Sequence, residues 1–322
     1  MSKKIRHIAL IAALMMAVLS GAKAQQAPIF TNFTNSYAYA NAGFAGLSQG
    51  VNVLGLYRQQ WSGFTDNDGN AVAPTTFLLT GDMPFKVLHG GLGLSIVQDK
   101  IGFESNTNVG LGYSYHLDLG GSKLGIGVAA TLLNRSADFG KLTSTNSADP
   151  LLQGLGEESD MMFDFNVGAF WQVPESFYLG FSVVNVLETM GKALGQNAES
   201  SASFTTDRTF YLFAGYPFSF EMFPAFTFVP AVSVMSDIAS TQFNLSAKVV
   251  YNNVFSFGAN YRPQESVDLM VGLIIKDIMI GYSYDINTMG LDVPGSHEIA
   301  VSYCFKLDLD RTPRDYRSVR FL

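Results

Sequence analysis

Large apolar residues occupy every second position along much of this chain, and this alternation limits the possible folds more than any other feature. In Gly90–Leu119 ("GGLGLSIVQDKIGFESNTNVGLGYSYHLDL") the apolar residues alternate with glycine, serine and charged residues. A period of two residues indicates a β-strand whose two faces meet different surroundings. In a soluble protein the apolar face packs into a core. In an outer-membrane barrel it faces lipid, and the small or polar face lines the lumen.

The amino terminus indicates that the protein is exported. Three basic residues between positions 3 and 6 precede an apolar run, Ile8–Leu19, and Ala22–Ala24 fits the small-x-small site of a signal peptidase. The run is shorter than the roughly 20 residues that a membrane-spanning helix needs, which argues against an uncleaved anchor. We therefore expect residues 1–24 to be a cleaved signal peptide and Gln25 to begin the mature chain.

Alternating segments recur along the whole mature sequence. There are fourteen, at residues 51–59, 74–82, 90–98, 107–118, 122–133, 161–172, 176–186, 207–216, 225–235, 241–251, 253–262, 266–275, 277–286 and 296–307. Each is close to the roughly 9–11 residues with which a tilted strand crosses a bilayer. No stretch after the signal could cross as a helix, and a closed sheet is the other structure that pairs every backbone group in hydrocarbon.

The connections between these segments are sorted by length. The long ones follow odd-numbered segments, at Gln60–Ala73, Asn134–Asp160, Leu187–Thr206 and Asn287–Gly295, and the tightest turns, near Gly121, Pro174 and Lys276, follow even-numbered ones. Bacterial barrels have short periplasmic turns and longer extracellular loops. An exported β-propeller, the competing soluble fold, would show a repeat of about 40–50 residues, and none is seen. The sequence therefore predicts an all-β protein, a transmembrane antiparallel β-barrel of about 14 strands over residues 51–307, in the outer membrane.

The two faces of each strand should respond differently to substitution. In the fifth segment we expect Ile126 to face lipid and Gly127 to face the lumen. Arginine in place of Ile126 should cost roughly 2–4 kcal/mol near the midplane, whereas serine in place of Gly127 is expected to be mild.

Two segments lie outside the predicted barrel. Residues 25–50 are polar and aromatic without strong periodicity, so they are expected either to plug the lumen or to lie in the periplasm. Residues 308–322 form a tail with four arginines and few acids near its end, expected in the periplasm, where it contacts a partner or an acidic surface or is simply solvated.

Charge and motif content argue against several classes of function. The chain is acidic, with a formal net charge of −7, which gives no electrostatic basis for binding nucleic acid. The single cysteine, Cys304, cannot form an internal disulfide, and the scattered histidines are expected in the lumen or in loops. No motif for a nucleophile, a phosphate loop or a metal site is present. We therefore predict no catalytic residues, no cofactor and no metal.

Three stretches carry a resemblance to a known family. They are "NAGFAG" with "LYRQQWSGF" (41–46 and 56–64), "VQDKIG" (97–102), and "YDIN" with "GSHEIAVSYCF" (284–287 and 295–305). In this order they resemble the PorP/SprF family of type IX secretion system membrane proteins. One departure is at Asn41, which is followed by Ala42–Gly43 where the family has Pro-Ala.

The resemblance implies an outer-membrane protein of Bacteroidetes-type bacteria that is not an enzyme. It would assist export or surface attachment of large secreted proteins, including gliding adhesins. Its partners would be these secreted proteins, other secretion-system components and outer-membrane lipid. A channel or hydrophobic-solute transporter of similar strand count remains the alternative.

The candidate partner-contact or structural residues fall in two groups near strand ends. They are Tyr57, Arg58, Gln60 and Trp61 at the end of the first strand, and Asp99, Lys100, Ser296, His297 and Glu298 near the outer loops. Tyr57 and Trp61 suit a membrane interface, and Arg58 is expected to face the lumen or to snorkel outward.

Overall fold

The computed structural model describes residues 27–48, 50–65, 69, 72–141, 156–192, 204–290 and 293–306. The expected signal peptide and carboxy-terminal tail therefore lie outside the described residues. Among the helices that the structure describes, none is long and apolar enough to cross a membrane.

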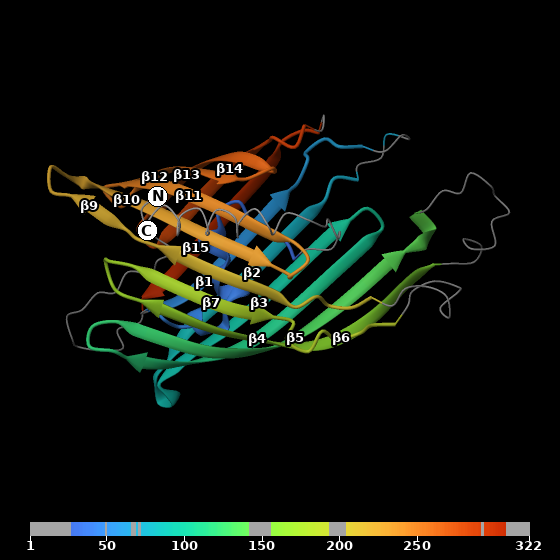
Figure 1. Ribbon diagram of the computed structural model, residues 1–322, viewed down its shortest axis with the longest axis horizontal. Helices are drawn as coiled ribbons and strands as arrows, with labels where there is room; N and C mark the ends of the chain where they lie inside the picture. Colours follow the sequence, from blue (N-terminus) through green and yellow to red (C-terminus); the bar gives the residue numbers. More distant parts are fainter. Residues whose placement is uncertain are drawn as a thin grey trace, which may run out of the picture.

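Fourteen antiparallel strands close into a barrel (Figure 1). They are β1 (Gly50–Gln59), β2 (Thr75–Phe85), β3 (Gly90–Ile101), β4 (Glu104–Asp118), β5 (Lys123–Asp138), β6 (Glu157–Gln172), β7 (Tyr178–Val184), β8 (Thr209–Gly215), β10 (Phe223–Ser236), β11 (Thr241–Tyr251), β12 (Phe255–Arg262), β13 (Ser266–Ile275), β14 (Ile278–Asn287) and β15 (Ser296–Lys306). Each pairs with its sequence neighbours, and β1 also pairs with β15, which closes the ring. The predicted barrel and its strand number are confirmed.

The side chains alternate between the two faces as the sequence pattern predicts. On β5, Ile126 and Val128 are about half exposed on the outer face, while Ser114 on the neighbouring β4 is completely buried on the inner face. Similar rows of exposed apolar side chains run along the other strands. An exposed apolar surface of this extent is suited to lipid.

The chain after β8 departs from the predicted strand boundaries. A short strand, β9 (Phe218–Phe220), follows β8 after Tyr216 and Pro217 and pairs with the first half of β10. Pro217 has no backbone N–H to donate, and the pairing is interrupted there. The predicted segments 207–216 and 225–235 therefore leave out residues that are paired, because β9 and β10 continue the pairing almost to their turn.

The long connections lie at one end of the barrel. Because neighbouring strands are antiparallel, the β1–β2, β5–β6, β7–β8 and β14–β15 connections share that end. The β5–β6 connection is shorter than predicted, since these two strands extend to Asp138 and from Glu157. Following the rule for bacterial barrels, we take this as the outer end and the opposite one as the periplasmic end.

Residues 27–48 occupy the interior of the barrel and are named the plug. Three short helices form much of it: η1 (Phe33–Ser36), α2 (Tyr37–Ala40) and η2 (Ala42–Phe44). Phe33, Tyr37 and Phe44 are buried against inward-facing residues of the wall. Figure 1 shows the plug in blue among the strands. Of the two locations considered for this segment, these residues occupy the lumen.

Candidate functional site

The turn in "NAGFAG" fixes the plug to the wall through Asn41. Its side-chain oxygen accepts a hydrogen bond from the N–H of Gly43 at 2.9 Å, which begins η2. Its amide nitrogen donates to the carbonyls of Ala169 on β6 and Phe181 on β7, at 3.0 and 3.2 Å. The turn forms without the family's proline because the Asn41 side chain supplies the constraint.

Glycines on β5 allow the plug to approach the wall closely. A Cβ atom on Gly127 would lie 2.3 Å from the carbonyl carbon of Ala42, and one on Gly125 would lie 2.1 Å from the carbonyl oxygen of Gly43. Both distances are well below van der Waals contact. The expectation that Gly127 tolerates serine is therefore wrong, because its inner face meets the plug backbone rather than open lumen.

An aromatic cluster surrounds Tyr37 where the plug meets strands β6, β7 and β8. The ring of Tyr37 packs on Phe44, Phe170, Tyr178 and Phe213, with centroids 4.9–5.6 Å apart. Its hydroxyl donates to the hydroxyl of Tyr178 at 2.8 Å. Burial, with added effects from Tyr178, raises the pKa of Tyr37 well above its ordinary value. The hydroxyl therefore stays neutral at physiological pH.

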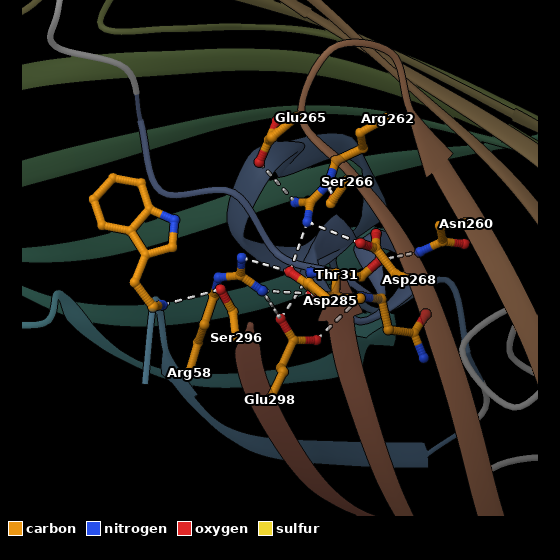
Figure 2. Close-up of polar contacts among 12 residues, drawn as sticks. Thr31, Arg58, Asn260, Arg262, Glu265, Ser266, Asp268, Asp285, Ser296 and Glu298 are labelled. Atoms are coloured by element: carbon orange, nitrogen blue, oxygen red, sulfur yellow. Dashed lines mark hydrogen bonds and ion pairs between the residues drawn. The ribbon is translucent and has the colours of Figure 1, made fainter. Parts of the chain in front are cut away.

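A buried ionic group lies near the outer end of the lumen (Figure 2). We call it the mouth cluster; its members are Thr31, Arg58, Arg262, Asp268, Asp285 and Glu298. Arg58 and Arg262 approach the same carboxylate oxygen, Asp285 Oδ2, at 2.7 and 2.6 Å. Arg58 also lies 3.6 Å from Glu298, and Arg262 lies 3.2 Å from Asp268. These charged side chains are at most 4% exposed, so the pairs have little screening from solvent.

The mouth cluster holds the start of the plug. The backbone N–H groups of Thr31 and Asn32 donate to the two oxygens of Glu298 at 2.7 and 3.0 Å. The hydroxyl of Thr31 donates to Asp285 at 2.6 Å and accepts from Arg58. Asn260 on β12 donates to the Thr31 carbonyl. Every polar group of Thr31 is therefore bonded to the wall.

Several backbone carbonyls in the periplasmic part of the plug also accept hydrogen bonds from the wall. Ser182 on β7 donates to the carbonyl of Ala40 at 2.6 Å, and Ser114 on β4 donates to that of Gly43 at 3.0 Å. The Nε2 atom of His116 lies 2.9 Å from the carbonyl oxygen of Ala45. Asp82 on β2 also accepts a hydrogen bond from the N–H of Gly46 at 3.2 Å, so polar side chains of several kinds hold the plug below, while arginine–carboxylate pairs surround it at the mouth.

The structure brings five of the nine sequence-predicted candidates together. Arg58 and Glu298 belong to the mouth cluster, Arg58 faces the lumen rather than snorkelling outward, and Ser296 accepts a hydrogen bond from the backbone of Trp61 at 3.1 Å. Gln60, Trp61 and Ser296 line a pocket at the mouth together with Arg58.

The other four candidates lie elsewhere. Tyr57 and Lys100 are exposed on the outer face of the barrel. His297 also faces outward, with Nδ1 2.7 Å from the hydroxyl of Tyr282, so the expectation that it lies in the lumen or a loop is wrong. Asp99 faces inward on β3 and accepts a hydrogen bond from Thr76, two strands from Arg58.

Sequence reasoning missed the cluster residues Thr31, Arg262, Asp268 and Asp285. The last three are charged residues at inward positions near the outer ends of strands. The alternation in the sequence identifies such positions, so it could have indicated these three residues. Nothing local in the sequence indicates Thr31. Among the described residues, no group of three or more His, Cys, Asp or Glu side chains is placed to hold a metal ion.

Comparison with known proteins identifies the family. The family model described as type IX secretion system membrane protein PorP/SprF matches residues 22–303. The chain belongs to the PorP/SprF family. A PorP/SprF membrane protein that folds as a transmembrane barrel resides in the outer membrane, and its family associates with secretion-system components.

Solved structures similar to this PorP/SprF protein are also barrels. The CymD monoaromatic hydrocarbon channel is 12% identical with a TM-score of 0.48, covering 86% of this chain and 94% of its own. A Pseudomonas aeruginosa FadL homologue is 12% identical with a TM-score of 0.48, covering 84% and 94%. The Acinetobacter baumannii outer membrane protein Omp33 is 9% identical with a TM-score of 0.43, covering 81% and 100%. No curated protein matches in the sequence comparison.

Proposed function

We propose that this protein is a non-catalytic outer-membrane accessory of type IX secretion. In this role it assists the secretion or surface attachment of large exported proteins such as adhesins, including gliding adhesins in some family members. The family match over residues 22–303 is the observation that carries this proposal. The exported proteins are the partners that the outer end of the barrel would meet.

The plug supports a docking role over a transport role. Residues 27–48 lie in the lumen and are hydrogen-bonded to strands on several sides of the wall, from Asp285 and Glu298 at the mouth to Ser114 and Ser182 below. A solute or a polypeptide crossing the lumen would have to displace these contacts together. A plugged barrel can instead present its outer rim and loops as a fixed surface.

The experiment is a clean deletion of the gene. Surface proteins and culture-fluid proteins are compared by mass spectrometry, and uptake of small and hydrophobic solutes is measured in parallel, with the complemented strain as control. We expect loss of one or a few large surface proteins with uptake unchanged. Unchanged secreted proteins together with a fall in nutrient uptake would replace this proposal with the channel or transporter.

A further inference from the structure

The mouth cluster does not account for the outward-facing candidates Tyr57, Lys100 and His297, because it lies on the inner face of the barrel. These three residues come from three of the stretches that resemble the PorP/SprF family. The closed barrel brings the stretches together on β15, β1 and β3, with β2 between the last two. The outer face of these strands is therefore a second place where the stretches meet.

Five polar side chains form one row on this outer face, which we call the outer row. Each member lies directly opposite the next in the strand pairing, and the members are Tyr284 on β14, His297 on β15, Gln59 on β1, Thr75 on β2 and Lys100 on β3. Their sequence neighbours, such as Arg58 and Glu298, are buried toward the lumen, so the row points outward. With strands spaced by ~4.8 Å, the row extends about 19 Å.

The outer row borders the surface that faces lipid. Two residues deeper on the same strands are Ile299, Tyr57 and Phe77, and all three side chains are exposed. Val301 and Val53 continue the exposed apolar surface farther down. Apolar side chains of a barrel contact the hydrocarbon, and aromatic rings lie at its boundary. The outer row is therefore at the level of the head groups of the outer leaflet.

Most polar groups of the outer row have no partner in the part of the chain that the structure describes. The side chains of Gln59, Thr75 and Lys100 make no hydrogen bond or ion pair there. His297 is held through Nδ1, 2.7 Å from the Tyr282 hydroxyl, and by the ring of Tyr284, with centroids 5.0 Å apart. Its Nε2 atom is left to donate or to accept, according to the tautomer. A hydroxyl group suits either state, because it both donates and accepts.

Lys100 adds a positive charge at the outermost end of the row. It is one residue from the end of β3, whereas Tyr284 is three residues from the end of β14, so the row rises toward Lys100. No carboxylate belongs to the row. The ammonium group of a lysine is a common phosphate ligand. The row therefore offers a site for phosphate at its outer end and sites for hydroxyl groups below it.

We propose that the outer row binds the head group of a phosphorylated glycolipid in the outer leaflet, with Lys100 on a phosphate and the uncharged members on sugar hydroxyls. The occupant is a lipid because the row continues the lipid-facing surface of the same strands. A row across five strands is wider than one phospholipid head group and suits a disaccharide. This inference concerns the barrel wall, so it holds or fails independently of the secretion role.

The test measures lipid binding to the purified full-length protein by native mass spectrometry. The protein in detergent is titrated with lipid A, whose head group is a phosphorylated glucosamine disaccharide, with the same lipid after removal of its phosphates, and with phosphatidylglycerol. We expect lipid A to bind most tightly, the dephosphorylated lipid more weakly, and phosphatidylglycerol most weakly.

Lys100→Gln removes the charge at an exposed position that has no partner, so the fold should be retained. We expect this variant to bind lipid A about tenfold more weakly and to bind the dephosphorylated lipid as the wild type does. The matched control is Lys276→Gln, at the exposed turn between β13 and β14. It makes the same change of charge at the periplasmic end and should alter neither affinity.

His297→Phe tests the hydroxyl contacts, because it keeps a ring beside Tyr284 but removes Nε2. We expect it to weaken binding of both forms of lipid A by a similar factor. A slow-migrating folded form on unheated gels verifies that each variant folds, and Gln59→Leu takes the place of His297→Phe if the latter does not.

Four results would overturn the proposal. They are no binding of lipid A, equal binding of phosphatidylglycerol, an equal loss of affinity in Lys276→Gln and Lys100→Gln, and no change of either affinity in the folded variant that tests the hydroxyl contacts.

Discussion

Arg58 on β1 and Asp285 on β14 form an ion pair of 2.7 Å across the intervening strand β15. The pair joins two of the stretches that resemble the PorP/SprF family, because Arg58 lies in "LYRQQWSGF" and Asp285 lies in "YDIN". Glu298, from the "GSHEIAVSYCF" stretch, completes the contact with the plug. Motifs far apart in the sequence are thus neighbours in one polar group that seats the plug.

Replacing Arg58 by methionine should destabilise the barrel strongly. Asp285 would keep Arg262, but Glu298 would lose its cationic partner while remaining buried. Breaking a buried pair in this way typically costs about 3–5 kcal/mol. Urea unfolding of the protein in detergent or lipid vesicles, followed by tryptophan fluorescence, measures the loss. The control is Lys141→Ala, whose ion pair with Asp138 is largely exposed and should change stability by under about 1 kcal/mol. Similar midpoints for the two variants would contradict the assignment.

Alanine in place of Gly127 should dislodge the plug locally. Its methyl group would lie 2.3 Å from the backbone of Ala42, an overlap that costs about 1–3 kcal/mol. Gly55→Ala on β1 is the matched control, since its Cβ would meet nothing within 4 Å. Limited proteolysis of the plug, together with the urea midpoint, reports the difference. Equal protection in both variants would mean that the plug does not sit on β5.

The orientation of the barrel predicts a labelling pattern on intact cells. With Cys304 replaced by alanine, a cysteine at Lys141, in the β5–β6 connection, should react with a membrane-impermeant maleimide. A cysteine at Val87, 79% exposed between β2 and β3, should react only after the outer membrane is opened. The reverse pattern would invert the topology.

Alkaline pH should weaken the packing of the plug against the barrel wall. Burial, with a smaller effect from the charge of Asp99, raises the pKa of Tyr39 from 10 to about 12. A raised pKa means that the fold favours the protonated form, so this contribution is complete below pH 10 and is lost as the pH rises through about 12. Unfolding free energies at pH 9 to 12 should therefore fall more steeply for the wild type than for Tyr39→Phe. If the unfolding free energies of the wild type and Tyr39→Phe fall equally with pH, the fold does not favour the protonated form of Tyr39.

The alternation and the parity of loop lengths were sufficient to predict the barrel. Both are local signals, because lipid exposure acts on each strand separately. The interruption at Pro217 predicts the end of a strand, since sequence spacing does not show that β9 resumes pairing with β10.

The site was less predictable for a physical reason. Arg58 and Glu298 stood out as charged residues near strand ends, but their partner Thr31 lies in a segment without periodicity. The alternation marks Gly127 as an ordinary lumen position, and only the folded chain brings Ala42 against it. Contacts of the plug depend on its path through the closed barrel, and no local pattern encodes that path.

The ionic conductance of the purified protein in planar lipid bilayers tests the central claim that the plug closes the lumen. The wild type is predicted to insert without a steady open channel, and deletion of residues 27–48 is predicted to yield a stable conductance from the same barrel. A steady wild-type conductance that the deletion does not increase would contradict a plugged barrel and favour the channel.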